Sequence, residues 1–510
     1  MPQNVRELLA CGRRDAPALL APGRMPLSFA GLEALVEQSA AELAALGIGN
    51  GDRVALVLPG GAVAAAAFLA VASVAAAAPL NPAYRREEFD FYFHDLRPKA
   101  LVVAAGEEGP AVAVARARGV RILRLVEDPA VAGRFTLRPE EGASSAGARP
   151  VFAAAGDVAL LLHTSGTTSR PKLVPLLHRN LLASCRHIAD TLRLSAEDRV
   201  LEIMPLFHIH GLVAGLLAPL GAGGSVFCAP GFDALRLFGW LDESRASWIT
   251  AVPTMYQTML ARAARNREVL ARQRLRFLRS SSAPMPPAVM RELEATFSCP
   301  LIESYGMTEA AHQMTSNPLP PGVRRPGSCG LPAGPEVRIV DEAGRFQPPG
   351  REGEVAISGP NVTPGYLDNE EANAAAFFEA EGRRWFRTGD LGRFDDDGHL
   401  HLVGRSKEII NRGGEKISPL EVDNVLMEHP AVAQAVAFAL PHAKLGEEVA
   451  AAIVLRAGAE ASERELRDFC AARLADFKVP RRILFVEAIP KGPTGKLQRI
   501  GLAQRLGLVS

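Results

Sequence analysis

Short apolar runs alternate with longer helix-like stretches through most of residues 1–300. Five of these runs span residues 54–58, 100–104, 158–162, 200–204 and 248–252. A continuous apolar run of this length is typical of a strand buried on both faces of a sheet, and a helix between two such strands allows them to run parallel. The alternation therefore predicts a large α/β unit built on parallel sheets.

A chain of 510 residues is too long for a single hydrophobic core. The pattern of apolar and polar residues changes twice in the rest of the chain. Between residues 327 and 402, glycines are frequent and apolar residues alternate with polar ones, which predicts a small β region. Beyond residue 404 the pattern is that of a compact α+β module. Its expected elements are helices at 419–428 and 462–474, the second capped by Ser462, and strands at 432–439 and 449–455.

We therefore expect a large N-terminal domain over residues 1–405 and a small C-terminal domain over residues 406–510. The uncharged stretch at 54–84 is rich in alanine and interrupted by proline and glycine, so it predicts a buried helix between strands and no membrane span. The N-terminus lacks the apolar core of a signal peptide, and we expect a cytoplasmic protein.

The composition excludes some classes of partner. Lys and Arg total 57 against 56 Asp and Glu, so the net charge of +1 provides no general field that would attract nucleic acid. The six cysteines form no C-x-x-C pair, which favours reduced thiols over a disulfide framework or a zinc site. The oligomeric state stays open.

The run T-S-G-T-T-S-R-P-K at residues 164–172 follows one apolar run and precedes a helix-like stretch at 178–194. Backbone N–H groups and hydroxyls in such a loop can surround the oxygens of a polyphosphate, although a Ser/Thr-rich surface turn is the plainer alternative. The spacing is not that of a Walker loop. The candidate phosphate-binding residues are Thr164, Ser165, Gly166, Thr167, Thr168, Ser169 and Lys172.

A second run, Y-G-M-T-E at residues 305–309, follows an apolar segment at 300–303. We expect it on the loop after a strand's carboxyl end, where open α/β sheets bind ligands. The ring of Tyr305 can stack on adenine and Thr308 can donate to a phosphate. Glu309 can bind Mg²⁺ that is held between phosphates.

Three further runs complete the pattern. In R-T-G-D-L-G, Asp390 on a glycine turn can accept both hydroxyls of a ribose, although an ordinary Gly-Asp turn is the alternative. In G-R-S-K, Arg405 can reach a ribose oxygen and Lys407 lies where the two domains join. In P-T-G-K near the C-terminus, Lys496 can project into a cleft from a glycine turn, whereas a lone terminal lysine is usually solvated.

These five runs occur in the order and approximate spacing of the adenylate-forming enzymes, and the chain resembles an acyl-CoA synthetase of that superfamily over nearly its whole length. The resemblance implies ATP, Mg²⁺ and coenzyme A as cofactor and co-substrates and a carboxylic acid as substrate. The acid attacks the α-phosphate to give an acyl-adenylate and pyrophosphate, and coenzyme A then takes the acyl group.

The resemblance also implies roles for individual residues. Lys496, Thr308 and Glu309 act in adenylation, and the C-terminal domain turns about Lys407 for the second step. The turn at Gly413 and Gly414 then approaches the pantetheine arm. Ser169 and Leu173 depart from the commonest form of the family, which has glycine at both positions.

For the acid, the resemblance implies a site formed by residues 205–211, 279–283 and 310–318. The candidates there are His208, Ser281, Ser282 and His312. Serine and histidine line an alkyl chain poorly and a second carboxylate well, although His312 alternatively only holds the loop. M-T-E-A-A-H-Q-M-T-S-N-P-L-P and the S-G-T-T-S-R-P-K loop resemble the oxalate–CoA ligases, so oxalate is the expected acid.

Several alternatives stay open. Malonate, a medium-chain acyl acid or an aryl acid could replace oxalate. Luciferases and stand-alone adenylation enzymes that load a carrier protein share the adenylation motifs. A module that binds ATP without reacting is the remaining class, and it predicts no release of pyrophosphate.

Overall fold

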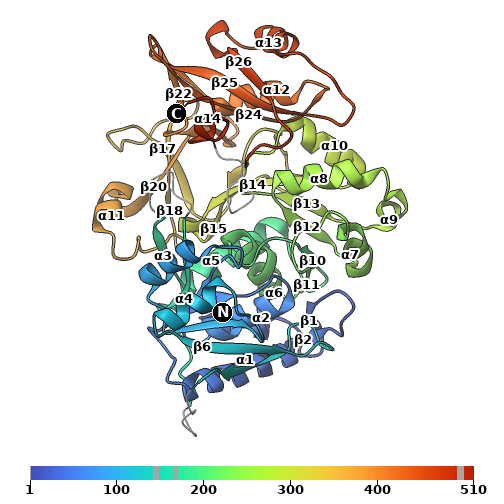
Figure 1. Cartoon of the computed structure of the whole chain (residues 1–510), viewed down its shortest axis with the longest axis vertical. Helices are drawn as coiled ribbons and strands as arrows, with labels where there is room; N and C mark the ends of the chain where they lie inside the picture. The colour runs from blue at the N-terminus through green and yellow to red at the C-terminus, as the bar shows by residue number, and fades with distance from the viewer. Residues whose placement is uncertain (1, 142–148, 165–170, 491–498, 510) are drawn as a thin grey trace.

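The computed structural model describes residues 2–141, 149–164, 171–490 and 499–509. Within these ranges the chain forms a nine-stranded sheet, a seven-stranded sheet and two five-stranded sheets. In Figure 1 the red C-terminal elements lie at the top, beside α8 and α10, and the blue and green elements of the large sheets lie below them. The predicted fold is confirmed: a large α/β unit with a small β region and a small α+β C-terminal domain.

The seven-stranded sheet contains three of the predicted strands and is parallel from β6 to β8. In spatial order its strands are β7 (Phe135–Pro139), β6 (Arg121–Glu127), β5 (Ala100–Ala104), β3 (Arg53–Val57), β4 (Ala76–Pro79), β8 (Val158–His163) and β9 (Leu173–Leu177). Helix α2 (Ala62–Ala72) connects β3 to β4, and all of its residues are buried. The uncharged stretch is therefore the buried helix that the sequence predicts.

The nine-stranded sheet contains the other two predicted strands and is parallel from β1 to β14. Its spatial order is β16 (Leu331–Pro332), β15 (His312–Ser316), β14 (Leu301–Met307), β13 (Phe277–Ser280), β12 (Trp248–Ala251), β10 (Arg199–Glu202), β11 (Ser225–Cys228), β1 (Pro17–Leu20) and β2 (Leu27–Ser28). The carboxyl ends of β10, β12, β13 and β14 consequently share one edge of the sheet.

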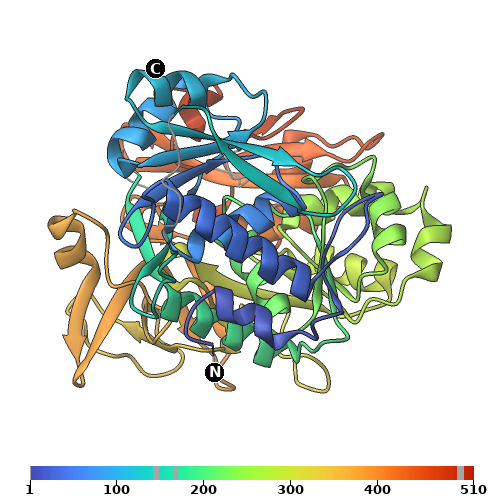
Figure 2. The ribbon, with the colours of Figure 1, turned by 90° about the horizontal axis from the view of Figure 1, so that it is seen from below.

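Helices cover both faces of both large sheets. A shared core lies between the sheets and contains α1 (Phe29–Ala45), α2, α5 (His178–Leu192), the π-helix η2 (His210–Leu217) and α6 (Ala218–Gly221). The outer face of the seven-stranded sheet packs against α3 (Arg86–Leu96) and α4 (Pro110–Ala117), and these cyan helices lie above the cyan strands in Figure 2. The outer face of the nine-stranded sheet packs against α7 (Leu237–Ser244), α8 (Pro253–Ala263) and α10 (Pro287–Phe297).

The small β region is a five-stranded antiparallel sheet. Its elements are β17 (Glu336–Val340), β18 (Gly353–Ser358), α11 (Glu370–Ala376), β19 (Phe377–Ala380), β20 (Arg383–Phe394) and β21 (Leu400–Arg405). The predicted β region at 327–402 is confirmed, and α11 is an addition to it.

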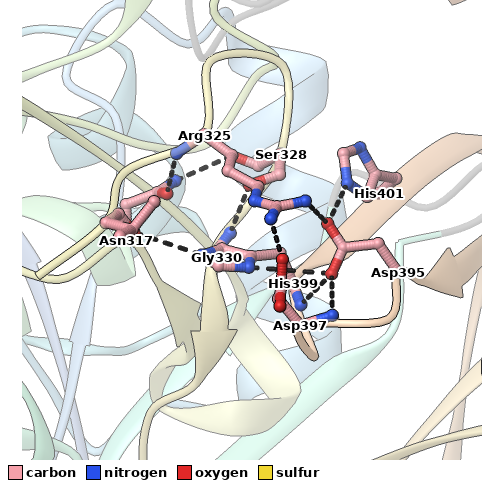
Figure 3. A network of polar contacts seen from close by, with 9 residues as sticks. Asn317, Arg325, Ser328, Gly330, Asp395, Asp397, His399 and His401 are labelled. Atoms are coloured by element: carbon pink, nitrogen blue, oxygen red, sulfur yellow. Dashed lines mark hydrogen bonds and ion pairs between the residues drawn. The ribbon is translucent and has the colours of Figure 1, made fainter.

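A polar network joins this region to the segment that follows β15 (Figure 3). Asp395 accepts hydrogen bonds from Arg325 Nη1 at 2.9 Å and from the backbone N–H of His399 at 2.9 Å, and it lies 3.0 Å from His401 Nε2. These neighbours lower the pKa of Asp395 to about 2 despite the opposing effect of desolvation. The network holds the β20–β21 turn, and with it Asp390, against the nine-stranded sheet.

The C-terminal domain confirms its predicted elements to within a few residues. It contains β22 (Ile410–Arg412), β23 (Glu415–Ile417), α12 (Pro419–Met427), β24 (Val432–His442), β25 (Gly446–Leu455), α13 (Glu463–Ala471), β26 (Arg482–Phe485) and α14 (Leu502–Arg505). Ser462 caps α13 in a capping box with Glu465, as predicted. The remaining short elements are η1 (Arg6–Cys11), α9 (Arg267–Arg272), η3 (Thr308–Ala310) and η4 (Asp476–Lys478).

The helix-like stretch at 178–194 is confirmed as α5, and the strand β9 that precedes it was not predicted; β9 pairs antiparallel with β8, and Leu173 is one of its buried residues. One expectation from the sequence is wrong. The Y-G-M-T-E run does not lie wholly on a loop, because β14 continues through Tyr305 to Met307 by pairing with β15. None of the helices within the described ranges is long and apolar enough to cross a membrane.

The pairing of β14 with β15 depends on Gly306. A Cβ atom at this position would lie 1.7 Å from the carbonyl oxygen of His312, so the two backbones must separate if glycine is replaced. We expect Gly306→Ala to destabilise the protein by about 2–4 kcal/mol, as overpacking against rigid backbone does. Urea unfolding followed by circular dichroism measures the change.

Gly239→Ala on the exposed face of α7 is the matched control, since a Cβ atom there meets nothing within 4 Å. This replacement should stabilise the protein by about 0.5–1 kcal/mol, because alanine is a better helix former than glycine. A Gly306→Ala protein as stable as the wild type would contradict the close backbone approach.

Candidate active site

Three of the residues predicted to bind adenosine meet in one cluster. The phenol of Tyr305, near the end of β14, donates a hydrogen bond to Asp390 in β20. Arg405, the last residue of β21, donates from Nε to Asp390 Oδ1 at 3.1 Å. Burial and the neighbouring carboxylate raise the pKa of Tyr305, so its hydroxyl stays a donor.

The backbone around Asp390 explains how the carboxylate is presented. Gly389 has φ of 75°, a conformation that favours glycine, at the point where the pairing of β20 with β18 shifts register. The hydroxyl of Thr388 accepts from the backbone N–H of Asp390 at 3.1 Å and donates to the carbonyl of Val355 at 2.8 Å. The turn is therefore fixed on both sides, as a hydroxyl-binding carboxylate requires.

A second cluster surrounds Glu309. Its side chain is 5% exposed and its Oε1 accepts a hydrogen bond from the hydroxyl of Tyr366 at 2.8 Å. Burial raises the pKa of Glu309. The Nζ atom of Lys172 lies 4.4 Å from the centre of the Tyr366 ring. Burial lowers the pKa of Lys172, Glu309 opposes this effect, and the charge of Lys407 adds to it. Glu309 and Lys407 are thus both within electrostatic reach of Lys172.

The chemistry of Glu309 fits a magnesium ion. In the described part of the chain, no three His, Cys, Asp or Glu residues are grouped so that they could hold a metal. Mg²⁺ is commonly bound by one or two carboxylates and by phosphate oxygens and water, rather than by a cage of side chains. A buried carboxylate that is hydrogen-bonded to a neutral phenol suits that mode.

A third cluster lies at the carboxyl ends of β12 and β13. Arg279 in β13 is fully buried, and its Nη1 lies 3.1 Å from His312 Nε2 and 3.4 Å from both His210 Nε2 and Thr250 Oγ1. Its Nη2 donates to Gln313 Oε1 at 3.2 Å.

The two imidazoles of this cluster complete it. His210 and His312 stack with ring centres 4.9 Å apart. His210 also contacts Ser282 Oγ through Nδ1 at 3.1 Å and Thr250 Oγ1 through Nε2 at 2.6 Å. Two residues predicted for the acid site, Ser282 and His312, are therefore joined through His210 and Arg279.

The backbone of this cluster is strained. Ser282, Ala311 and His312 have φ of 74°, 46° and 103°, although none is glycine. The value for His312 lies outside the left-handed region that non-glycine residues occasionally occupy. Such conformations cost about 1–3 kcal/mol each and persist where the surroundings hold them, commonly at functional sites. Here the contacts with Arg279 and His210 hold His312.

The other candidates for the acid site are less closely connected. Ser281 is buried and donates its hydroxyl to the carbonyl of Ser304 at 3.0 Å. The ring of His208 is half-buried and lies 4.6 Å from that of Phe207. Thr308 is half-buried at the start of η3. Their roles remain predictions.

Some predicted residues lie outside the described part of the chain. These are Ser165, Gly166, Thr167, Thr168, Ser169 and Lys496. At the edge of the loop, the backbone N–H of Thr164 donates to the carbonyl of Lys172 at 2.9 Å. Gly413 and Gly414 form the turn between β22 and β23 with φ of 60° and 96°, as a two-residue hairpin turn requires.

Three residues of these clusters, Tyr366, Arg279 and His210, are not among the site residues predicted from the sequence. Tyr366 occurs in no run that resembles a ligand-binding motif, and only the fold brings it to Glu309 and Lys172. Arg279 and His210 lie within residues 279–283 and 205–211, two of the segments that are predicted to form the acid site. An arginine inside a buried strand is unusual enough to have been a signal.

The chain is similar to known proteins over nearly its whole length. Residues 9–367 match the model of the AMP-binding enzyme family, and residues 421–496 match the AMP-binding enzyme C-terminal domain. An oxalate–CoA ligase of Arabidopsis thaliana is 45% identical over 96% of this chain and 95% of its own, and one of Saccharomyces cerevisiae is 42% identical over 89% and 86%. The crystal structure of ATP-bound MatB from Rhodopseudomonas palustris aligns with a TM-score of 0.88 at 31% identity, covering 99% of both chains.

The burial of Glu309 makes stability depend on pH. Because its pKa is raised in the folded state, ionisation of Glu309 costs stability as the pH rises above the unfolded value of about 4.5. Glu309→Gln cannot ionise and keeps an acceptor for Tyr366. We expect the Tm of the variant to exceed that of the wild type by an amount that grows between pH 4.5 and pH 7.5, as measured by thermal unfolding. Glu379→Gln, on the exposed side of β19, is the control, and an equal pH dependence of both variants would contradict the argument.

Proposed function

The chain belongs to the AMP-binding enzyme family, and we propose that the acid it joins to coenzyme A is oxalate. The reaction is an ATP-dependent acid–thiol ligation through an acyl-adenylate. For oxalate it consumes ATP and coenzyme A and yields oxalyl-CoA, AMP and diphosphate. ATP and coenzyme A are substrates, together with a small carboxylic acid.

In the first half-reaction, a carboxylate oxygen of the acid forms a bond to the α-phosphorus and diphosphate leaves. Lys172 and the loop from Thr164 to Ser169 bind the phosphates of ATP, and Lys496 and Thr308 stabilise the charge at the α-phosphate. Asp390 accepts the ribose hydroxyls, Arg405 keeps that carboxylate oriented, and Tyr305 lies beside the adenine. Mg²⁺ bound by Glu309 would neutralise charge on the phosphates.

In the second half-reaction, the thiol of coenzyme A attacks the acyl carbon and AMP leaves. The domain of residues 406–510 turns about Lys407 relative to the domain of residues 1–405, which removes Lys496 and brings in the turn at Gly413 and Gly414. Two glycines without side chains allow the backbone to approach the thin pantetheine arm.

One observation carries the choice of oxalate: Ser282, His210, His312 and Arg279 form a continuous polar cluster next to the Y-G-M-T-E run. Buried polar groups of this kind line an alkyl chain poorly and favour an acid whose second end also carries oxygen atoms. The names of the relatives from Arabidopsis thaliana and Saccharomyces cerevisiae agree with this choice.

A panel of acids tests the proposal. We expect pyrophosphate release that depends on ATP and the acid, with kcat/KM for oxalate at least about a hundredfold above that for acetate, malonate, octanoate or benzoate. Formation of the coenzyme A thioester, followed by chromatography, excludes a carrier protein as the acceptor. Preference for octanoate or benzoate would leave a general acyl-CoA synthetase, and pyrophosphate release without a thioester would indicate a carrier-loading enzyme.

Replacement of Lys496 should affect the two half-reactions differently. We expect Lys496→Ala to lower acid-dependent pyrophosphate release by about a hundredfold or more, because a cation at the α-phosphate is lost. Reaction of a synthetic acyl-adenylate with coenzyme A should change only a few-fold. Lys478→Ala, which removes an ion pair with Glu421 in the same domain, is the control. Equal loss in both half-reactions would contradict the assigned role.

A further inference from the structure

We propose that Arg279 determines the specificity of the acid site by supplying, through His210 and His312, the positive charge that a dianionic acid neutralises. This inference rests on the proposed function. It names the residue that supplies the positive charge and explains how the site distinguishes a dianionic acid from a monoanionic one. Arg279 acts through the two imidazoles and is therefore a positioning residue.

Arg279 is an unusual residue for the interior of a parallel sheet. Its relative exposure is 0%, and burial lowers its pKa to about 10, so the guanidinium remains charged at neutral pH. Within the described ranges, its polar partners are Thr250, His210, His312 and Gln313, and no carboxylate lies within ion-pair distance of it. A buried cation that is solvated by neutral groups makes the folded protein less stable than an apolar side chain of the same size would.

The elements packed around Arg279 bring few titratable groups to it. His210 comes from η2 and His312 from β15. Tyr256 in α8 donates its hydroxyl to the backbone carbonyl of Arg279 at 2.9 Å, and burial raises the pKa of that phenol. Beyond Gln313, whose Nε2 donates to the carbonyl of His187 at 3.3 Å, lies α5. None of these groups is an anion at neutral pH, and no carboxylate among the described residues forms an ion pair with Arg279.

The guanidinium also fixes the orientation of hydrogen atoms on the imidazoles. A guanidinium group is only a donor, so the Nε2 atom of His312, at 3.1 Å from Nη1, must accept. His312 then carries its hydrogen on Nδ1. Nη1 also lies 3.4 Å from Nε2 of His210, which contacts Thr250 Oγ1 at 2.6 Å. We infer the tautomer of His210 that accepts at Nε2, in which Nδ1 donates to Ser282 Oγ at 3.1 Å.

This chain of donors explains selection for two negative charges. One carboxylate of the acid must reach the α-phosphate of ATP, so a monoanion brings no second charge to the cluster. A dianion brings a second carboxylate to a set of N–H and O–H donors polarised by a buried cation. Charge-assisted hydrogen bonds of this kind are about twice as strong as neutral ones and gain further where water is excluded.

The test compares two acids of nearly equal size. Oxamate is oxalate in which an amide replaces one carboxylate, so it has a single negative charge. In the wild type we expect kcat/KM for oxalate to exceed that for oxamate by about a hundredfold or more. In Arg279→Met this ratio should fall at least about tenfold, through a higher KM for oxalate, with little change in the kinetics of oxamate. Arg279→Lys keeps the charge and should retain most of the preference for oxalate.

Arg199→Met is the matched control. Arg199 is half-buried at the opposite end of β10 and contacts Ser225 Oγ at 3.0 Å and the carbonyl of Ser244 at 2.8 Å, again without a carboxylate partner. Its replacement should change Tm without changing the ratio of oxalate to oxamate. If Arg279→Met lowers kcat/KM for both acids equally, Arg279 only holds the fold, and the inference is overturned.

The remaining outcomes separate this inference from the proposed function. A wild type that prefers malonate to oxalate overturns oxalate as the substrate, and the same variants then test the charge requirement with malonate and malonamate. A wild type that prefers oxamate or acetate overturns both. If Arg279→Met does not fold, Arg279→Lys decides: retained preference for the dianion supports the inference, and complete loss overturns it.

Discussion

The antiparallel pairing of β14 with β15 is the constraint on which the rest of the site depends. A single short segment, 305–312, brings Tyr305 to Asp390, Glu309 to Tyr366 and His312 to Arg279. The segment can turn back only because Gly306 has no side chain beneath the carbonyl of His312. The nucleotide, metal and acid sides of the proposed site are therefore set by one stretch of backbone.

The buried charged residues of the site differ in how their charges are balanced by neighbouring residues. Asp390 is paired with Arg405, which orients its carboxylate. Arg279 is buried against neutral partners, and the burial of Glu309 is only partly offset by the charges of Arg405 and Lys172; both arrangements cost stability in the folded protein. Such a cost is tolerated where a ligand of opposite charge restores the balance, and it is a common reason why functional sites are less stable than they could be.

The sequence predicts the parts of this protein that depend on local pattern. The buried parallel strands, helix α2 and the capped helix α13 follow from apolar runs, alanine content and a Ser-x-x-Glu cap. The extension of β14 and the existence of β9 depend on pairing between strands, which periodicity does not reveal. Tyr366 and Arg279 act through residues distant in sequence, so only the fold identifies their partners.

The coupling through Gly306 also limits how acid specificity can change. Because the carbonyl of His312 lies against the backbone of Gly306, a shift of His312 would also move Tyr305 and the end of β14, and with them the contact to Asp390. Arg279 in β13 and His210 in η2 contact the side chain of His312, but neither belongs to the backbone of β14 and β15. Selection for a different acid is therefore expected to act on the residues that surround His312, while the backbone of the β14–β15 turn stays the same.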